Sequence, residues 1–256
     1  MFELSGTQIG GWINSFLLPL FRIGSMLMVM PIVGTQLVPR RIRLYFAVAF
    51  TVAIAPVLPE MPQVDALSVQ AILLIAEQII IGVLLGLVLQ MMFHIFVFAG
   101  QLISMQMGLG FASLMDPATG VSVPLLGQFL LMLVTLLFLA VNGHLVAFEI
   151  MAESFVTLPV GQALDIGHYT VFAGRLSWVI GAALLLALPA VSSLLVINIA
   201  FGVMTRAAPQ LNIFTIGFPL TLIMGMIIFW ASTAEILTHF QTITSEALFL
   251  MRSFTQ

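Results

Sequence analysis

The chain has 256 residues, of which 61% are hydrophobic and 7% are charged, and its formal net charge is −3. Soluble domains carry roughly 25% charged residues, so this composition excludes an ordinary soluble protein and favours an integral membrane protein built of helices. The seven basic residues form no long run and cysteine is absent, which argues against nucleic-acid binding and excludes disulfides and thiolate metal sites.

Six apolar segments follow one another along the chain. The first follows no basic leader and contains Arg22, so we expect no cleaved signal peptide. A membrane-spanning helix needs about 20 apolar residues, but the second segment has only 15 and the third has 30. Pro19, Pro189 and Pro219 lie in the first, fifth and sixth segments, where they predict kinks or breaks. The sequence therefore predicts an all-α fold of membrane-associated helical hairpins with broken or kinked helices. The six segments are Ile9–Met30, Leu44–Leu58, Val69–Phe98, Leu125–Phe148, Leu176–Met204 and Leu211–Leu237.

Small residues recur at the spacing that lets two membrane helices approach closely. Glycine occupies positions 6 and 10 at the start of the first segment, one just before it and one within it, and positions 82 and 86 in the third. Residues four apart lie on one helix face, so each pair predicts a close backbone contact.

Polar side chains interrupt the apolar segments. An ionisable group in hydrocarbon is costly and usually faces protein or water. These residues therefore indicate either a polar passage or buried pairs that fix the helices in register, for example Arg22 with Glu77. They are Arg22, Glu77, Gln90, His94, Asn142, His144, Glu149 and Asn198.

The segment Gly100–Pro124 is nearly as apolar as its flanks, yet it contains four glycines, two prolines and the Asp116-Pro117 break. One regular helix is therefore not expected over it. Lipid cannot satisfy irregular backbone, so the segment must be buried in protein or line a cavity. Methionine can seal and re-pack around varied surfaces, and Met107 and Met115 lie in this segment. The pattern favours a passage or its stopper.

Residues that could carry catalysis are scattered. The four histidines lie far apart in the sequence and no H-x3-H pair occurs, so no metal site is predicted. Gly108-x-Gly110 lacks a third glycine and a lysine, so no phosphate-binding loop is predicted. We therefore expect no enzyme activity, no catalytic residue and no cofactor. The histidines are His94, His144, His168 and His239.

An ordered set of motifs along nearly the whole chain resembles the flagellar biosynthetic protein FliR family, the membrane export-gate subunits of type III secretion. Each motif is weak by itself, but their order is specific. They are Arg22-x-Gly24, Pro31-x2-Gly34, Val38-Pro39-Arg40, Glu77-x4-Gly82-x3-Gly86, Ala99-Gly100, Met107-Gly108-Leu109-Gly110-Phe111-Ala112, Asp116-Pro117, Asn142-Gly143-His144, Leu158-Pro159-Val160-Gly161, Arg206-x2-Pro209-x2-Asn212-x-Phe214 and Ile216-Gly217-Phe218-Pro219.

Membership in that family would imply a helical, pore-bearing complex with FliP and FliQ at the flagellar basal body in the bacterial inner membrane. FlhB and FlhA would lie nearby, and unfolded flagellar proteins would be the substrates. The resemblance also implies a FliP-like part over residues 1–165 and a FliQ-like helical hairpin over residues 166–256. The best boundary that the sequence itself offers is the polar stretch Pro159–Tyr169, which agrees with this division.

The resemblance places a pore-plug loop at about residues 107–122. Glycines would supply its bends, apolar side chains would fill the closed pore, and Asp116-Pro117 would stop helix growth. The residues assigned to this loop are Met107, Gly108, Leu109, Gly110, Phe111, Met115, Asp116, Pro117 and Gly120. A buried structural role is assigned to Arg22, Glu77, His94, Asn142, His144, Arg206 and Asn212.

Three alternatives stay open at this stage. Virulence-type secretion gates share the architecture, although Asn142-Gly143-His144 and the stretch from Pro209 to Pro219 look more flagellar. A secondary transporter with a site at broken helices would need matched interruptions in two halves, and none is visible. A structural subunit that never touches cargo would leave the loop without contact to substrate.

Overall fold

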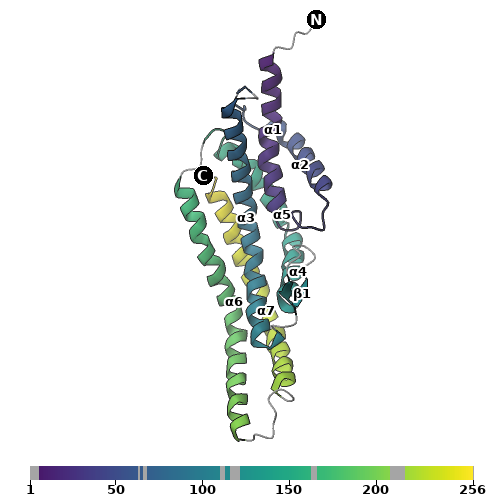
Figure 1. The fold of residues 1–256 in the computed structure, drawn as a ribbon, viewed down its shortest axis with the longest axis vertical. Coiled ribbons are helices and arrows are strands. Elements are labelled where there is room, and N and C mark those ends of the chain that lie inside the picture. The colour runs from purple at the N-terminus through teal and green to yellow at the C-terminus, as the bar shows by residue number, and fades with distance from the viewer. Residues whose placement is uncertain are drawn as a thin grey trace. The chain divides into compact units, whose positions relative to one another are not determined.

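The computed structural model describes most of the chain, and the described part is overwhelmingly helical (Figure 1). The predicted all-α character is confirmed, with one short pair of strands added. The described residues are 6–62, 64–65, 68–109, 113–115, 122–162, 166–207 and 217–255. The elements are α1 (Gly6–Val29), α2 (Arg40–Ile54), the 3-10 turn η1 (Ala55–Val57), α3 (Val69–Gln106), β1 (Ser113–Met115), β2 (Ser122–Pro124), α4 (Leu125–Ala140), α5 (Gly143–Thr157), α6 (Ile166–Ala207) and α7 (Phe218–Ser253).

Three of the described helices are long and apolar enough to cross a membrane, namely α3, α6 and α7. Helices α4 and α5 form a bent pair, with an angle of 68° at their junction, that could count as a fourth span. The fourth apolar segment of the sequence is thus two helices. With 15 residues, α2 is shorter than a spanning helix requires.

Two of the breaks expected at prolines do not occur. Helices α1 and α6 continue through Pro19 and Pro189, so of the kinks or breaks predicted there, a break does not occur at either position. A proline removes one backbone hydrogen bond, and packing against neighbours lets a membrane helix tolerate this loss. Pro219 is the second residue of α7, where an N–H group has no helical partner anyway. The marked bend instead follows Asn142, whose φ of 56° is left-handed.

The chain forms two compact units, and four helices contribute residues to both. The first unit comprises Met1–Met91, Leu139–Ala173 and Glu246–Gln256, and the second comprises Met92–Phe138 and Gly174–Ser245. The helices with residues in both are α3, α4, α6 and α7.

In the first unit, α1 packs against α3 through the glycines at positions 82 and 86. A Cβ atom on Gly82 would overlap the carbonyl oxygen of Arg22, and one on Gly86 would lie 2.9 Å from the carbonyl oxygen of Met26. Both contacts are with the backbone of α1. The close approach predicted from this glycine spacing is therefore confirmed.

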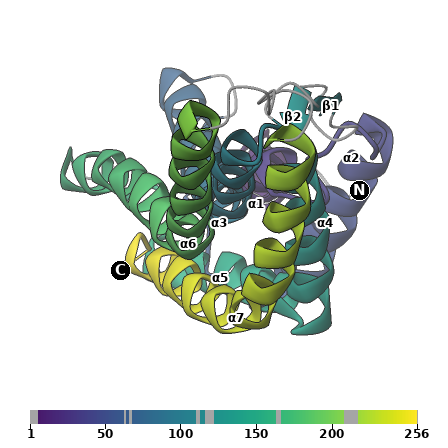
Figure 2. The same cartoon turned by 90° about the horizontal axis from the view of Figure 1, so that it is seen from below.

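In the second unit, segments of α3, α4, α6 and α7 lie side by side (Figure 2). Helices α3 and α4 approach closely where a Cβ on Gly100 would lie 2.6 Å from the Cα of Gly127. Aromatic rings fill the remaining spaces, with Phe96 and Phe240 tilted at a centroid distance of 6.3 Å. This packing holds the end of α3, and with it the start of the irregular segment.

Candidate functional site

The irregular segment begins where α3 ends, in the second unit. The amide of Met107 still donates to the carbonyl of Ile103 at 3.0 Å, and the amide of Gly108 donates to that of Met105 at 3.2 Å. Gly108 has a φ of 81°, in the left-handed region that glycine adopts at little cost. Met107, although it follows the last helical residue, is 0% exposed. The chain thus leaves the helix while its side chain remains fully buried.

Met107 is buried against a glycine of α7. A Cβ on Gly225 would lie 2.5 Å from Cγ, 2.7 Å from Cε and 3.0 Å from Sδ of Met107. These distances are far below van der Waals contact, so the position of the Met107 side chain requires the absence of a side chain at residue 225. The neighbouring Gly108 faces α7 as well, because its Cβ would lie 2.9 Å from Cε2 of Phe218.

Helix α6 supplies a third contact. The Nδ2 atom of Asn198 donates a hydrogen bond of 3.3 Å to the carbonyl of Gln106. Gln106 is the last residue of α3, and the final carbonyls of a helix have no partner within it. Asn198, predicted to be a buried polar group, is half-buried and stabilises the end of α3. We call Gln106, Met107 and Gly108 with their partners Asn198, Phe218 and Gly225 the loop root.

Beyond the loop root, the described chain forms β1 and β2. The two strands pair antiparallel, with Leu114 opposite Val123, so the segment is not one continuous helix and that prediction is confirmed for the described residues. Leu109 is half-buried, and Met115 is the last residue of β1. The other predicted plug residues, Gly110, Phe111, Asp116, Pro117 and Gly120, lie outside the described residues.

A second polar cluster surrounds Arg22 in the first unit. Arg22 is 0% exposed, and its Nε donates to Oε1 of Gln78 at 2.6 Å. One terminal nitrogen donates to the carbonyl and the hydroxyl of Ser154 at 2.8 and 3.2 Å, and the other donates to the carbonyl of Leu158 at 3.0 Å. The guanidinium also lies 4.4 Å from the ring centroid of Phe155. Arg22 thereby satisfies carbonyls at the end of α5, which makes it a structural residue.

The sequence suggests the acidic residue Glu77 as the partner of Arg22, but the observed hydrogen bond is with the neutral Gln78. The guanidinium binds Gln78, the residue after Glu77, and the Oε1 atom of Glu77 is buried without a hydrogen-bond partner. The reading of Arg22 as a buried group that fixes helices in register is supported. Its hydrogen bond on α3 is with Gln78, while the opposite charges of Arg22 and Glu77 attract each other without a hydrogen bond.

The remaining predicted polar residues do not converge on one site. His94 is half-buried and stacks on Phe98 at a centroid distance of 6.0 Å, and His144 is half-buried in the other unit. Burial is expected for Asn142 and Arg206, but both are exposed in the single chain. Asn212 lies outside the described residues. No described group of three or more His, Asp or Glu side chains could hold a metal ion.

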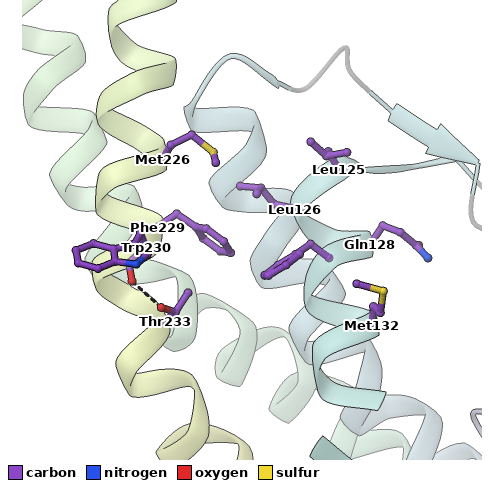
Figure 3. Close-up of a pocket in the computed structure, with 9 residues that line it drawn as sticks. Leu125, Leu126, Gln128, Met132, Met226, Phe229, Trp230 and Thr233 are labelled. Carbon is purple, nitrogen blue, oxygen red and sulfur yellow. Dashed lines mark hydrogen bonds between the residues drawn. The ribbon is translucent and has the colours of Figure 1, made fainter. Parts of the chain in front are cut away.

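The second unit also contains an apolar groove of about 510 Å³ between α4 and α7. Met226 and Phe229 project from α7 toward α4 (Figure 3), and Trp230 beside them is 76% exposed. The groove carries no ionisable side chain, so its chemistry suits apolar contact rather than catalysis. The lining residues are Leu125, Leu126, Gln128, Phe129, Met132, Met226, Phe229, Trp230 and Thr233.

Comparison with known proteins identifies the family. Residues 13–247 match the family described as "Bacterial export proteins, family 1". The flagellar biosynthetic protein FliR of Escherichia coli (strain K12) is 39% identical over 227 residues, which cover 88% of this chain and 87% of that protein. This chain belongs to the FliR family. The resemblance predicted from the ordered motifs is confirmed.

Other FliR proteins are similar over the same extent. That of Pectobacterium carotovorum is 38% identical over 229 residues, covering 88% of this chain and 87% of the relative. That of Bacillus subtilis (strain 168) is 30% identical over 243 residues, covering 93% of each. Together with the three apolar helices, membership in the FliR family makes this chain a membrane component of the flagellar export apparatus.

Some site residues could not be found from the sequence of this FliR-family chain. Met107, Gly108 and Asn198 were recognisable, as an apolar residue at the start of an irregular segment, a glycine and an intramembrane polar group. Gly225 was not, because glycine is common in membrane helices and its Met-Gly-Met surroundings indicate no partner. Only the placement of α7 against the end of α3 reveals its role.

Proposed function

We propose that this chain is a pore-forming subunit of the flagellar type III protein export gate. It assembles with FliP and FliQ and passes unfolded flagellar proteins across the bacterial inner membrane, with FlhB and FlhA nearby. Its loop of about residues 107–122 plugs the channel in the closed state. Family membership supports the flagellar role, and the loop supports the gating role.

The observation that carries the gating role is the burial of Met107 at the point where the helix stops. An apolar, irregular segment at this depth must be sheltered by protein. The start of this segment is sheltered by protein, because Met107 is completely buried where Gly108 turns the chain out of the helix. A segment that starts inside a helical unit and is rich in Gly and Met is suited to occupying a channel between subunits.

The exposed apolar surface of α6 and α7 supports assembly with other helical subunits and with lipid. In the most apolar 18-residue stretch of each helix, only 22% of α6 and 17% of α7 is buried within the chain. Surfaces of this kind mark protein or membrane contacts rather than contact with water. We therefore propose FliP, FliQ and membrane lipid as the groups that cover these helices.

The proposed division into a FliP-like part, residues 1–165, and a FliQ-like part, residues 166–256, agrees with the element bounds. Helix α6 begins at Ile166, and α6 and α7 are a consecutive pair of 42 and 36 residues. The compact units do not follow this division, since each draws on both parts of the sequence.

The gating role is tested by replacing residues 110–121 with a Gly-Ser linker of equal length. This change removes the proposed plug and leaves Met107, Gly108 and α4 in place. We expect the complex to assemble but the membrane to become permeable to ions and small solutes, measured per assembled complex. A milder variant, Phe111→Ser with Met115→Ser, should leak less than the linker variant but more than the unaltered chain. A membrane that stays equally tight with the linker would contradict the stopper role.

Two further measurements separate the alternatives. Purification with the other subunits as a stable complex supports the gate, whereas a lone chain that binds a small solute would support a secondary transporter. Crosslinking from Phe111 to a stalled unfolded substrate supports cargo contact. Absence of any crosslink along the loop would favour a structural subunit that cargo does not touch.

A further inference from the structure

We propose that Met107 and Gly225 form a latch that holds the loop root against α7 and must separate before a substrate can pass. The inference rests on the proposed function, because it states how the plug is retained and released. It assigns roles to Gly225 and Asn198, and it makes α7 the element from which the loop detaches.

The latch is a side chain seated in a gap that only glycine leaves. The three Met107 atoms nearest to a Cβ at residue 225 are Cγ, Sδ and Cε. All three lie beyond the Cβ of Met107, so the contact belongs entirely to the flexible part of that side chain. Methionine has an unbranched side chain with several rotatable bonds. It can therefore leave the gap by rotation, without a change in the backbone of either helix.

Among the described residues, the other contacts at the loop root are few and separable. One is the single hydrogen bond of 3.3 Å from Asn198 to Gln106, and another is the contact of Gly108 with Phe218, which is itself 46% exposed. The cluster around Arg22 in the first unit has four hydrogen bonds and a stacked ring. Segments that move in function are held by few contacts of this kind. The loop root is thus built to open while the Arg22 cluster stays closed.

The close contact at Gly225 is not shared by every glycine of the same unit. A Cβ placed on Gly181 or Gly202 would meet no described atom within 4 Å. These glycines are in α6 and belong to the second unit, as Gly225 does. They provide matched control positions at which a side chain displaces no described atom.

The first test locks the latch with a disulfide. The chain has no cysteine, so the pair Met107→Cys with Gly225→Cys introduces the only two thiols. The sulfur at residue 107 takes the place of Cγ, 2.5 Å from the Cβ position of residue 225, and a disulfide can close from there with a small shift. In assembled complexes in cells, we expect crosslinking under oxidation, loss of substrate export, and recovery of export on reduction.

The control pair is Met107→Cys with Gly202→Cys, which should not crosslink and whose export should be the same under oxidation and under reduction. Crosslinking is measured as the crosslinked fraction of all copies of the chain in the membrane. A low expression level therefore does not hide the result. Failure of the first pair to crosslink would show that Met107 does not rest on Gly225. A crosslink that leaves export unchanged would show that the root need not move, and either result would overturn the latch.

The second test opens the latch from either side. Gly225→Ala should expel the Met107 side chain and increase the permeability of the closed gate several-fold. Met107→Ala removes the three seated atoms and should increase permeability by a similar factor. Met107→Ala with Gly225→Ala should leak no more than either single variant, because both changes break the same contact. Gly202→Ala should have no effect. Additive leakage in the double variant, or a tight gate with Met107→Ala, would contradict the latch.

Failure of the latch and failure of the proposed function give different results. If the linker at 110–121 causes a leak but Gly225→Ala does not, the plug stands and the latch is wrong. If Met107→Cys crosslinks to Gly225→Cys while the membrane stays tight with the linker, Met107 rests on Gly225 as inferred but the loop is no stopper.

Discussion

The Nε atom of Arg22 donates a hydrogen bond of 2.6 Å to Oε1 of Gln78, and both side chains are fully buried. This bond joins α1 to α3, and the remaining donors of Arg22 join α1 to the end of α5. One side chain thus connects three helices of the first unit. These hydrogen bonds fix one arrangement of the three helices, because a shift of any of them leaves a buried donor of Arg22 unpaired.

We predict that Arg22→Ala destabilises the chain by about 3 kcal/mol or more, because the Oε1 atom of Gln78 and the carbonyl of Leu158 lose their hydrogen-bond donor and each buried unpaired group costs roughly 1–3 kcal/mol. The measurement is the thermal stability of the purified complex in detergent. The control is Arg252→Ala, which removes the exposed ion pair with Glu153 at 3.3 Å and should cost about 1 kcal/mol or less. Equal effects of the two substitutions would refute the structural role of Arg22.

We predict opposite effects for two glycine substitutions in helices. Gly82→Ala should destabilise the α1–α3 packing by a few kcal/mol, since its Cβ would overlap the backbone of Arg22 and overpacking costs about 1–3 kcal/mol or more. Gly174→Ala meets no described atom within 4 Å and should stabilise α6 by up to about 1 kcal/mol through helix propensity. The comparison is made on thermal stability, and a loss at both positions would contradict the assigned packing.

The packing of α1 on α3 could be predicted from the sequence because glycine spacing is a local signal of close approach. The hydrogen-bond partner of Arg22 could not. Neighbouring residues on a helix point about 100° apart, so the choice between Glu77 and Gln78 depends on which face of α3 meets α1 and α5. The same limit applies to the loop root. Its irregular segment was readable, but Gly225 lies far along the sequence, and no local pattern pairs it with Met107.

Asn142 provides a prediction for the bend between α4 and α5. Its φ of 56° is left-handed, a conformation that asparagine tolerates and β-branched residues do not. Asn142→Gly should therefore be neutral or slightly stabilising, whereas Asn142→Val should destabilise the bend by about 1–2 kcal/mol. Limited proteolysis and thermal stability of the complex measure the difference. If valine and glycine behaved alike, the left-handed geometry at the bend would be wrong.

The hydrogen bond from Asn198 to Gln106 gives a last prediction, at the loop root. Side-chain hydrogen bonds between membrane helices contribute roughly 0.6 kcal/mol on average, so Asn198→Ala should change overall stability little. Its local effect should be larger, because the carbonyl at the end of α3 loses its partner and the root opens more often. We expect amide hydrogen exchange in a peptide covering Met107 to become about threefold faster, as 0.6 kcal/mol implies. Ser193→Ala on the same helix, whose hydroxyl donates to the carbonyl of Pro189 within α6, should leave this exchange unchanged. Identical exchange in the two variants would show that α6 does not hold the end of α3.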